Sequence, residues 1–266
     1  MFPRRTAKYD NGRNMRLLAV LLIIMTPIGA CELRVLTWNI HHGEGLDGKL
    51  DLARVGRVIR DARPDIVALQ EVDVRTERVM GRDTVRELER LTGMRGVFGA
   101  SMAFQGGGYG NAVFVNGTLL GSRVFPIGAS EGMEPRSILL TEMRPYRCSL
   151  DLAFLSTHFD HKSEEDRMAG AAMANLPISL PAILAGDLNA PPDDLVIGTL
   201  LQQWTSSTRG NGFSTIPAEA PKRQLDYVLF RPAKRWTVVE AKVMDEPVAS
   251  DHRPLLAVLK LLPGDE

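Results

Sequence analysis

From residue 33 to residue 262, short apolar runs alternate with stretches rich in glycine, proline, asparagine and charged residues. Residues 33–37 alternate apolar and polar positions, which predicts a strand that continues into Trp38 and Asn39. Continuous apolar runs at 66–69 and 182–185 predict buried strands. Further strands are predicted at 112–115, 138–142, 150–155, 225–230, 236–243 and 255–262.

Helices are predicted between these strands. Residues 50–62 are amphipathic, with apolar positions at Leu52, Val55, Val58 and Ile59. The sequence Thr84-Val85-Arg86-Glu87 has the form of a capping box, so a helix is expected to start there and to end near residue 93. The patterns of residues 163–175 and 193–203 predict two more helices. Because no repeat or linker divides the region, residues 32–266 are interpreted as one α/β domain with mixed, largely antiparallel sheets and helices outside.

The first 31 residues have a different pattern. Met15-Arg16 leads into an apolar run at 17–25, and small residues precede Cys31. This order is typical of a secretory signal peptide, and the run is short for a membrane span. Residues 28–31 also resemble the bacterial lipobox, whose cysteine becomes the lipidated first residue of the mature protein. We therefore expect an exported protein of the bacterial cell envelope, either lipid-anchored through Cys31 or periplasmic, or a secreted protein. The alternative is a buried N-terminal helix.

The composition narrows the choice of partner. Lys and Arg together number 32, as do Asp and Glu, so the formal net charge is +0. Nonspecific nucleic-acid binding draws on clustered Lys and Arg, so nucleic acid is not favoured as the partner, although one local basic groove would suffice. Cys31 and Cys148 are too few for a disulfide framework, and Cys148 is interpreted as a small core or edge residue.

Polar residues of one chemical kind follow or end the predicted strands. Carboxylate and amide oxygens suit Mg²⁺ or Mn²⁺, whereas too few Cys and His cluster in the sequence for a zinc site. An imidazole beside a carboxylate is also what general-base catalysis needs, and Asp251-His252 supplies both shortly before the last strand. The residues concerned are Asn39, Glu71, His158, Asp187, Asn189, Asp226, Asp251 and His252.

With these residues the chain resembles the endonuclease/exonuclease/phosphatase family, which includes deoxyribonuclease I, sphingomyelinases and inositol-phosphate phosphatases. The resemblance extends over about residues 33–262 and implies a four-layer α/β sandwich of two packed mixed sheets flanked by helices. It rests on Thr37-Trp38-Asn39, Leu69-Gln70-Glu71, Tyr109-Gly110-Asn111, Glu134-Pro135-Arg136, Thr157-His158, Gly186-Asp187-Leu188-Asn189, Leu225-Asp226-Tyr227 and Ser250-Asp251-His252, in that order.

The resemblance also implies roles for individual residues. Glu71 is the expected principal metal ligand, Asn39 completes or orients the metal shell, and Asp251 is a further ligand or an anchor behind it. His252 is the expected general base, oriented by Asp226, and His158 and Asn189 hydrogen-bond the phosphoryl oxygens. Asp187 positions the nucleophile or protonates the leaving oxygen. Arg136, Tyr109 and Asn111 are substrate-site candidates, whereas His41 and His42 border the site with a structural or solvated role favoured.

The substrate is less determined than the reaction. The favoured hypothesis is a metal-dependent phosphodiesterase that acts on a lipid headgroup or another small phosphoester. The export signal supports it, as does the similarity of the segment after Trp38 to the catalytic domain of GPI-anchor lipid-remodelling proteins. The alternatives are a secreted nuclease, for which Arg75, Arg78 and Arg82 are the nearby basic candidates, and a catalytically silent binding module. We expect a monomer.

Overall fold

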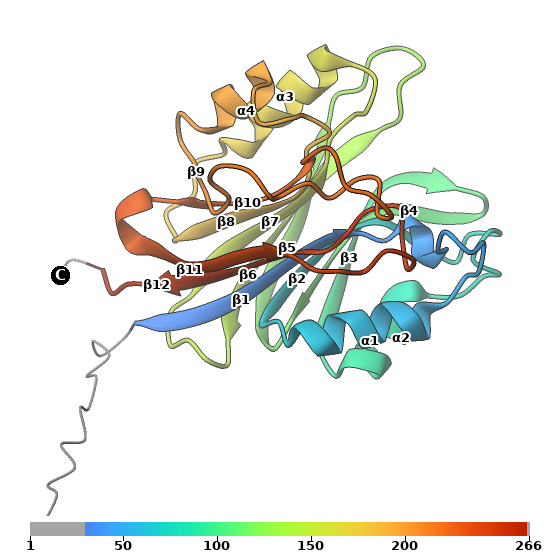
Figure 1. Ribbon diagram of the computed structural model, residues 1–266, viewed down its shortest axis with the longest axis horizontal. Coiled ribbons are helices and arrows are strands. Elements are labelled where there is room, and N and C mark those ends of the chain that lie inside the picture. Colours follow the sequence, from blue (N-terminus) through green and yellow to red (C-terminus); the bar gives the residue numbers. More distant parts are fainter. Residues whose placement is uncertain (1–29, 265–266) are drawn as a thin grey trace, which may run out of the picture.

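Residues 30–264 are described by the computed structural model and form two six-stranded sheets packed face to face (Figure 1). The first sheet has the order β11-β12-β1-β2-β4-β3, and the second has the order β5-β6-β7-β8-β10-β9. The strands are β1 (Cys31–Asn39), β2 (Ile66–Val74), β3 (Arg95–Phe104), β4 (Gly107–Val115), β5 (Gly117–Ile127), β6 (Arg136–Pro145), β7 (Leu152–His158), β8 (Ala182–Asp187), β9 (Thr205–Ser206), β10 (Asp226–Arg231), β11 (Trp236–Val243) and β12 (Leu255–Leu261).

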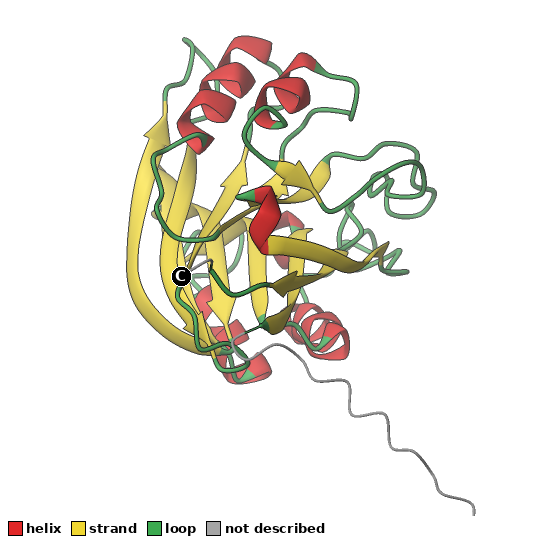
Figure 2. Ribbon diagram, turned by 90° about the vertical axis from the view of Figure 1, so that its left-hand side faces the viewer, coloured by secondary structure: helices red, strands yellow, loops and turns green. Residues whose placement is uncertain are grey.

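Helices cover the outer face of each sheet (Figure 2). Helices α1 (Leu52–Ala62) and α2 (Thr84–Thr92) pack on the first sheet, whereas α3 (Glu164–Ala174) and α4 (Leu195–Leu200) pack on the second. Two short 3₁₀ helices, η1 (His41–Gly43) and η2 (Ala233–Arg235), follow β1 and β10. The arrangement confirms the expected four-layer α/β sandwich.

Strand β1 shows how the sequence pattern makes these layers. Alternate residues of a strand point to opposite faces of its sheet. Leu33 and Val35 pack in the core between the two sheets, whereas Leu36 and Trp38 pack in the cluster that includes residues of α1 and α2. Both faces of the strand are therefore buried in apolar surroundings, which explains why the run from residue 33 to residue 38 is so rich in large apolar side chains.

Two predicted helices differ from their observed form. The side chain that caps α2 is Asp83, which accepts a hydrogen bond from the backbone N–H of Arg86, so Thr84 is the first helical residue and the predicted capping box is wrong. The carboxylate of Glu87 pairs instead with Arg82. Helix α4 is shorter than the predicted 193–203, because Asp194 caps its start and Leu201 ends it.

The sheet topology brings the predicted site residues to one edge of the sandwich. Strands β1 and β2 run parallel, as do β7 and β8, so the carboxyl ends of each pair lie side by side. Strand β10 runs antiparallel to β8 and starts where β8 ends, with Asp226 opposite Asp187. The loop before β12 reaches the same edge, because the indole N–H of Trp38 donates to the carbonyl of His252 at 2.8 Å.

The two cysteines form a disulfide that joins the start of β1 to the loop after β6. Cys31 and Cys148 are both buried, with an S–S distance of 1.93 Å across a sequence separation of 117 residues. The burial of Cys148 matches the sequence-based expectation, but its bond to Cys31 was not predicted. The sulfur of Cys31 can form either this disulfide or a thioether to a lipid, so the disulfide and lipid attachment at Cys31 exclude each other.

The predicted signal peptide falls almost entirely outside the described residues, which begin at residue 30. Within residues 30–264, no helix combines the length and the apolar character that crossing a membrane requires.

Candidate active site

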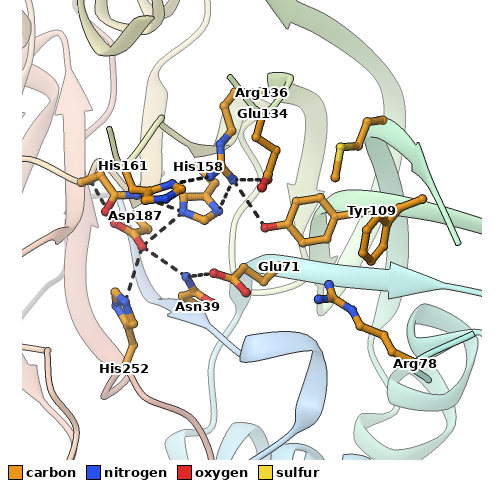
Figure 3. A pocket seen from close by; sticks show the side chains of 13 residues that line it. Asn39, Glu71, Arg78, Tyr109, Glu134, Arg136, His158, His161, Asp187 and His252 are labelled. Atoms are coloured by element: carbon orange, nitrogen blue, oxygen red, sulfur yellow. Dashed lines mark hydrogen bonds and ion pairs between the residues drawn. The ribbon is translucent and has the colours of Figure 1, made fainter. Parts of the chain in front are cut away.

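A polar pocket of about 270 Å³ opens at the edge where the strand ends meet (Figure 3). It combines six of the residues predicted from sequence to act in catalysis or metal binding with side chains from β3, β4 and the loops around them. Its lining residues are Asn39, Glu71, Arg78, Met102, Phe104, Tyr109, Glu134, Arg136, His158, His161, Asp187, Asn189 and His252.

His252 is held from behind by a buried carboxylate. Its Nδ1 lies 2.8 Å from Oδ2 of Asp226, which also accepts a hydrogen bond of 2.5 Å from the hydroxyl of Thr215. Asp226 is fully buried and does not line the pocket. The Nε2 atom of His252 lies 3.6 Å from Oδ2 of Asp187. The imidazole therefore has one nitrogen fixed on Asp226 and the other at the pocket.

Asp187 lies at the centre of the site. Its Oδ2 accepts a hydrogen bond of 3.2 Å from the amide of Asn39 and is 3.5 Å from Nε2 of His158. Its Oδ1 accepts from the backbone N–H of Asn189 at 3.0 Å. Asn189 has a φ of 48°, a conformation that few residues other than glycine adopt, and this tight turn is what allows the bond back to Asp187. One carboxylate thus joins residues from β1, β7, the loop after β8 and the loop before β12.

Burial and charge act on the two central groups in different ways. Burial raises the pKa of Asp187 to about 7, because the carboxylate is desolvated; the positive charge of His252 opposes the shift and the neighbouring Asp226 adds to it. Burial lowers the pKa of His252, but the charges of Asp226 and Asp187 outweigh this effect and bring it to about 10. His252 is therefore protonated at neutral pH in the metal-free protein.

His158 has the opposite character. Burial, together with the nearby charge of Arg136, holds the pKa of this imidazole well below its usual value, so His158 is neutral. Its Nδ1 lies 2.9 Å from a guanidinium nitrogen of Arg136, which can only donate. Nδ1 is therefore the acceptor, and the ring proton of His158 lies on Nε2, 3.5 Å from Oδ2 of Asp187.

Arg136 is itself buried and fixed on several sides. Its guanidinium lies 2.9 Å from the carboxylate of Glu134 and 3.4 Å from the hydroxyl of Tyr109, and it approaches His161 at 3.5 Å. These contacts place Glu134, Tyr109 and His161 around the guanidinium of Arg136, as Figure 3 shows.

Glu71 faces Asp187 from the first sheet. The ladder between β2 and β4 is interrupted between Leu69 and Val72, and Glu71 takes a φ of 57° in this bulge. A bulge changes the direction in which a side chain leaves a strand. The carboxylate of Glu71 lines the pocket and accepts a hydrogen bond of 2.9 Å from the amide of Asn39. It has no ion-pair partner among residues 30–264, which fits a bound cation.

Asn39 and Asp251, the residues expected beside Glu71 as metal ligands, do not direct free oxygens into the pocket. The side-chain oxygen of Asn39 accepts from the backbone N–H of His41 at 3.1 Å, so Asn39 orients Glu71 and Asp187 through its amide nitrogen. Asp251 does not line the pocket; its carboxylate accepts from the hydroxyl of Ser250 at 3.2 Å. Within the described residues, Asp187, Asp226 and His252 also offer ligand atoms within 4.8 Å of one another.

Of the three substrate-site candidates, two line the pocket and one does not. Tyr109 and Arg136 line the pocket, whereas Asn111 is buried behind it and donates to the carbonyl of Ser137 at 3.0 Å. Sequence reasoning did not assign Met102, Phe104, Glu134 or His161 to the site, and it considered Arg78 only as a basic residue near a nuclease site. Arg78 lies over the rings of Phe104 and Tyr109 and binds Asp73 through two nitrogens. The Glu134-Pro135-Arg136 motif was the available signal for Glu134.

Comparison with known proteins agrees with this geometry. The model of the "Endonuclease/Exonuclease/phosphatase family" matches residues 36–252. No curated protein matches the chain. A solved structure described as endonuclease/exonuclease/phosphatase from Beutenbergia cavernae is 23% identical, with 87% of this chain and 72% of that chain covered and a TM-score of 0.70.

Two further solved structures have the same fold. A mannosyl-6-phosphatase from Bacteroides thetaiotaomicron is 16% identical, covers 85% of this chain and 99% of that chain, and has a TM-score of 0.69. The human Nocturnin catalytic domain with bound sulfate is 20% identical, covers 86% and 94%, and has a TM-score of 0.67.

Proposed function

The chain belongs to the endonuclease/exonuclease/phosphatase family, whose members hydrolyse phosphoester bonds, and on that premise we propose a divalent-metal-dependent phosphodiesterase of the cell envelope. Its substrate in this proposal is a lipid headgroup or another small phosphoester. The observation that carries the proposal is the position of His252, held on Asp226 and directed at a pocket that Glu71 and His158 also line.

In the proposed reaction, His252 acts as the general base. With Nδ1–H donating to Asp226, a neutral His252 has a lone pair on Nε2 at the pocket and can accept a proton from water. The water oxygen then forms a bond to phosphorus while the bond from phosphorus to the leaving oxygen breaks. Asp187 is placed to position the water or to protonate the leaving oxygen, and a pKa of about 7 suits either role.

Charge on the phosphoryl group is met by donors on the second sheet. The Nε2–H of His158 and the amide of Asn189 are adjacent and fixed by their other contacts, so they are preorganised for phosphoryl oxygens. Arg136 adds a positive charge behind His158. The residue that fits the cation is Glu71, oriented by Asn39, with Mg²⁺ or Mn²⁺ suited to its oxygen. A divalent cation bound there neutralises charge on the phosphoryl oxygens.

The size and surroundings of the pocket favour a small substrate group. A volume of about 270 Å³ lies just below the range for small-molecule sites, roughly 300–1,000 Å³. The wall formed by Met102, Phe104 and Tyr109 offers apolar contact next to the polar centre. The predicted export signal and the similarity of the segment after Trp38 to GPI-anchor lipid-remodelling proteins support a substrate in the envelope.

A nuclease is the second candidate, because the family includes nucleases and DNA requires the same bond cleavage. The arginines that sequence reasoning offered for DNA each have an acidic neighbour: Arg78 pairs with Asp73, Arg82 with Glu87, and Arg75 approaches Asp83 at 3.8 Å. Such pairs reduce the positive potential available to a phosphate backbone. A silent binding module is disfavoured, because every predicted catalytic residue is present.

A substrate comparison tests the proposal. The purified protein is given Mg²⁺ or Mn²⁺ and offered phospholipid and bis-p-nitrophenyl phosphate in one series, and plasmid and single-stranded DNA in the other. We expect turnover of the small esters or the lipid and little cleavage of DNA, with His252→Gln as the inactive control. Rapid DNA cleavage without lipid or small-ester turnover would establish the nuclease instead.

A further inference from the structure

His41 and His42 lie beside Glu71. Each of these three side chains offers a ligand atom, and the three atoms lie within 4.8 Å of one another. The two histidines form the start of η1, directly after β1, and the two rings are 4.5 Å apart. Donors bound to one ion at about 2.1 Å lie up to about 4 Å apart, so a small side-chain rotation brings the three onto a common cation.

The backbone of this segment is held in an uncommon conformation. His41 and His42 have φ values of 44° and 46°, and Glu71 on the neighbouring strand has a φ of 57°. Residues other than glycine rarely adopt this region, and such strain collects at binding and catalytic sites. Here the result of the strain is that three side chains with metal-binding atoms point to one place from two separate elements.

Glu44 occupies one nitrogen of each imidazole. Its carboxylate lies 3.5 Å from Nε2 of His42, and its backbone carbonyl lies 3.2 Å from Nδ1 of His41. Histidines that bind metals almost always have their second nitrogen on a carboxylate or a carbonyl, which fixes the ring and its tautomer. This arrangement leaves Nδ1 of His42 and Nε2 of His41 for a ligand.

Nδ1 of His42 has no hydrogen-bond partner among the described residues that would compete with a metal ion. His42 is 6% exposed, and its Nδ1 is buried without a hydrogen-bond partner among the described residues. A buried polar atom without a partner is costly and calls for an explanation. The charge of nearby Arg78 does not oppose a cation strongly, because two of its nitrogens bind the buried carboxylate of Asp73.

We propose that His41, His42 and Glu71 bind a first-row transition-metal dication such as Zn²⁺ or Mn²⁺, with Glu44 orienting both imidazoles. Two nitrogens and one carboxylate oxygen suit these ions better than Mg²⁺, which prefers oxygen ligands. The proposal deepens the proposed function, because it assigns the ligands and the class of the cation at Glu71. It replaces Asn39 and Asp251 as ligands, because the side-chain oxygen of Asn39 accepts from the backbone N–H of His41 and the carboxylate of Asp251 accepts from the hydroxyl of Ser250.

Metal binding is measured without substrate, so failure of this proposal is distinct from failure of the proposed hydrolysis. The full-length protein is freed of metal with a chelator and titrated with Zn²⁺ in competition with a chromophoric chelator. We expect His41→Gln and His42→Gln each to weaken Zn²⁺ binding by about 10–100-fold or more, since even loss of an outer partner costs that much. His161→Gln, which removes an imidazole elsewhere in the pocket, is the matched control and keeps wild-type affinity.

His252→Gln separates this site from the cluster of Asp187, Asp226 and His252. Tight binding that survives His252→Gln but not His42→Gln supports the proposal, whereas the reverse pattern, or no tight Zn²⁺ binding by the wild-type protein, overturns it. Pulsed electron paramagnetic resonance of the Mn²⁺-loaded wild-type protein gives a second readout that needs no variant to fold. Coupling to imidazole nitrogen is expected, and a spectrum with oxygen ligands alone contradicts the proposal.

Discussion

Asp187 on β8 and Asp226 on β10 are direct cross-strand partners, and the imidazole of His252 contacts both carboxylates. Residues that lie opposite each other in an antiparallel pair point to the same face, so the ladder itself brings two negative charges together. His252 lies 2.8 Å from one and 3.6 Å from the other. The protonated imidazole is stabilised by this pair, and the site consequently stores a proton that it must release before His252 can act as a base.

The first prediction concerns the charge on His252. Asp226→Asn removes the closest carboxylate, so the protonated imidazole loses stabilisation and the pKa of His252 falls from about 10, by about 1–3 units, the usual effect of one nearby charge. The protein is titrated without metal, and the ring signals of His252 are followed by NMR. An unchanged midpoint in Asp226→Asn would contradict the assignment of Asp226 as the main source of the shift.

The same change has a kinetic consequence. Activity of a general base rises with pH as the imidazole loses its proton, so the rising limb of kcat/KM moves to lower pH in Asp226→Asn. The maximum rate falls because the ring has lost the acceptor that orients it. A limb that stays in place while the rate falls would assign it to a group other than His252.

A second prediction separates the base from the cation site. His252→Gln is expected to lower kcat by about 10²–10⁴-fold, the usual contribution of a general base, without changing metal affinity. Glu71→Gln removes the unpaired carboxylate, so the metal concentration for half-maximal activity rises first and added metal recovers part of the rate. Metal titrations of activity for both variants check this, with Glu240→Gln, an exposed residue paired with Lys242, as the control.

Sequence pattern was sufficient to predict much of this architecture, because the apolar runs of buried strands and the amphipathic spacing of helices are simple to recognise. The apolar runs predicted the strands that deliver Asn39, Glu71, His158 and Asp187, and the resemblance supplied the four-layer arrangement. The sequence pattern did not predict the direction of individual side chains. The sequence pattern did not indicate that Asp251 lies outside the pocket lining, or that Asp83 rather than Thr84 caps α2.

Contacts between residues far apart in the sequence were also not predicted. Glu71 reaches the pocket because β2 bulges against β4, which no run of residues in β2 alone indicates. Arg78 and Phe104 meet across a sheet edge, 26 positions apart in the sequence, and the disulfide joins residues 117 positions apart. Each of these depends on the assembled tertiary structure, and a single sequence does not reveal such pairs.

A third prediction tests the role of Arg136. Its side chain sets the tautomer of His158 by donating to Nδ1, and it is held by Glu134 and Tyr109. Arg136→Met removes the donor, so the proton of His158 is no longer confined to Nε2 and kcat is expected to fall by roughly 10²-fold or more, comparable to loss of an oxyanion donor. Arg136→Lys restores a charge and a donor and is expected to recover part of kcat.

NMR signals of the His158 ring distinguish positioning from a general loss of structure. The wild-type protein is expected to show the Nε2–H tautomer, and Arg136→Met a mixture of the two. If the variant keeps one tautomer and its thermal stability falls instead, Arg136 has a structural role rather than a positioning one.

The fourth prediction concerns the disulfide between Cys31 and Cys148. It closes a loop of 117 residues between the start of β1 and the loop after β6, so its removal increases the conformational entropy of the unfolded chain. Replacing both cysteines by serine is expected to lower the free energy of unfolding by about 2–5 kcal/mol, the usual cost of losing a native disulfide. Urea unfolding of the wild-type protein with and without reductant checks this. The double variant, which has no disulfide, should be insensitive to reductant.

The same bond makes the membrane attachment predicted from the lipobox-like sequence testable. A lipidated Cys31 has a thioether at its sulfur and cannot pair with Cys148, so the two chemical states give different intact masses and different counts of free thiol. If the disulfide of the structure persists in the exported protein, its mass lacks a lipid and thiol titration finds none until reductant is added. A lipid adduct with one free thiol, on Cys148, would show instead that Cys31 anchors the chain, and β1 would then be held at its start by packing and by its pairing with β12.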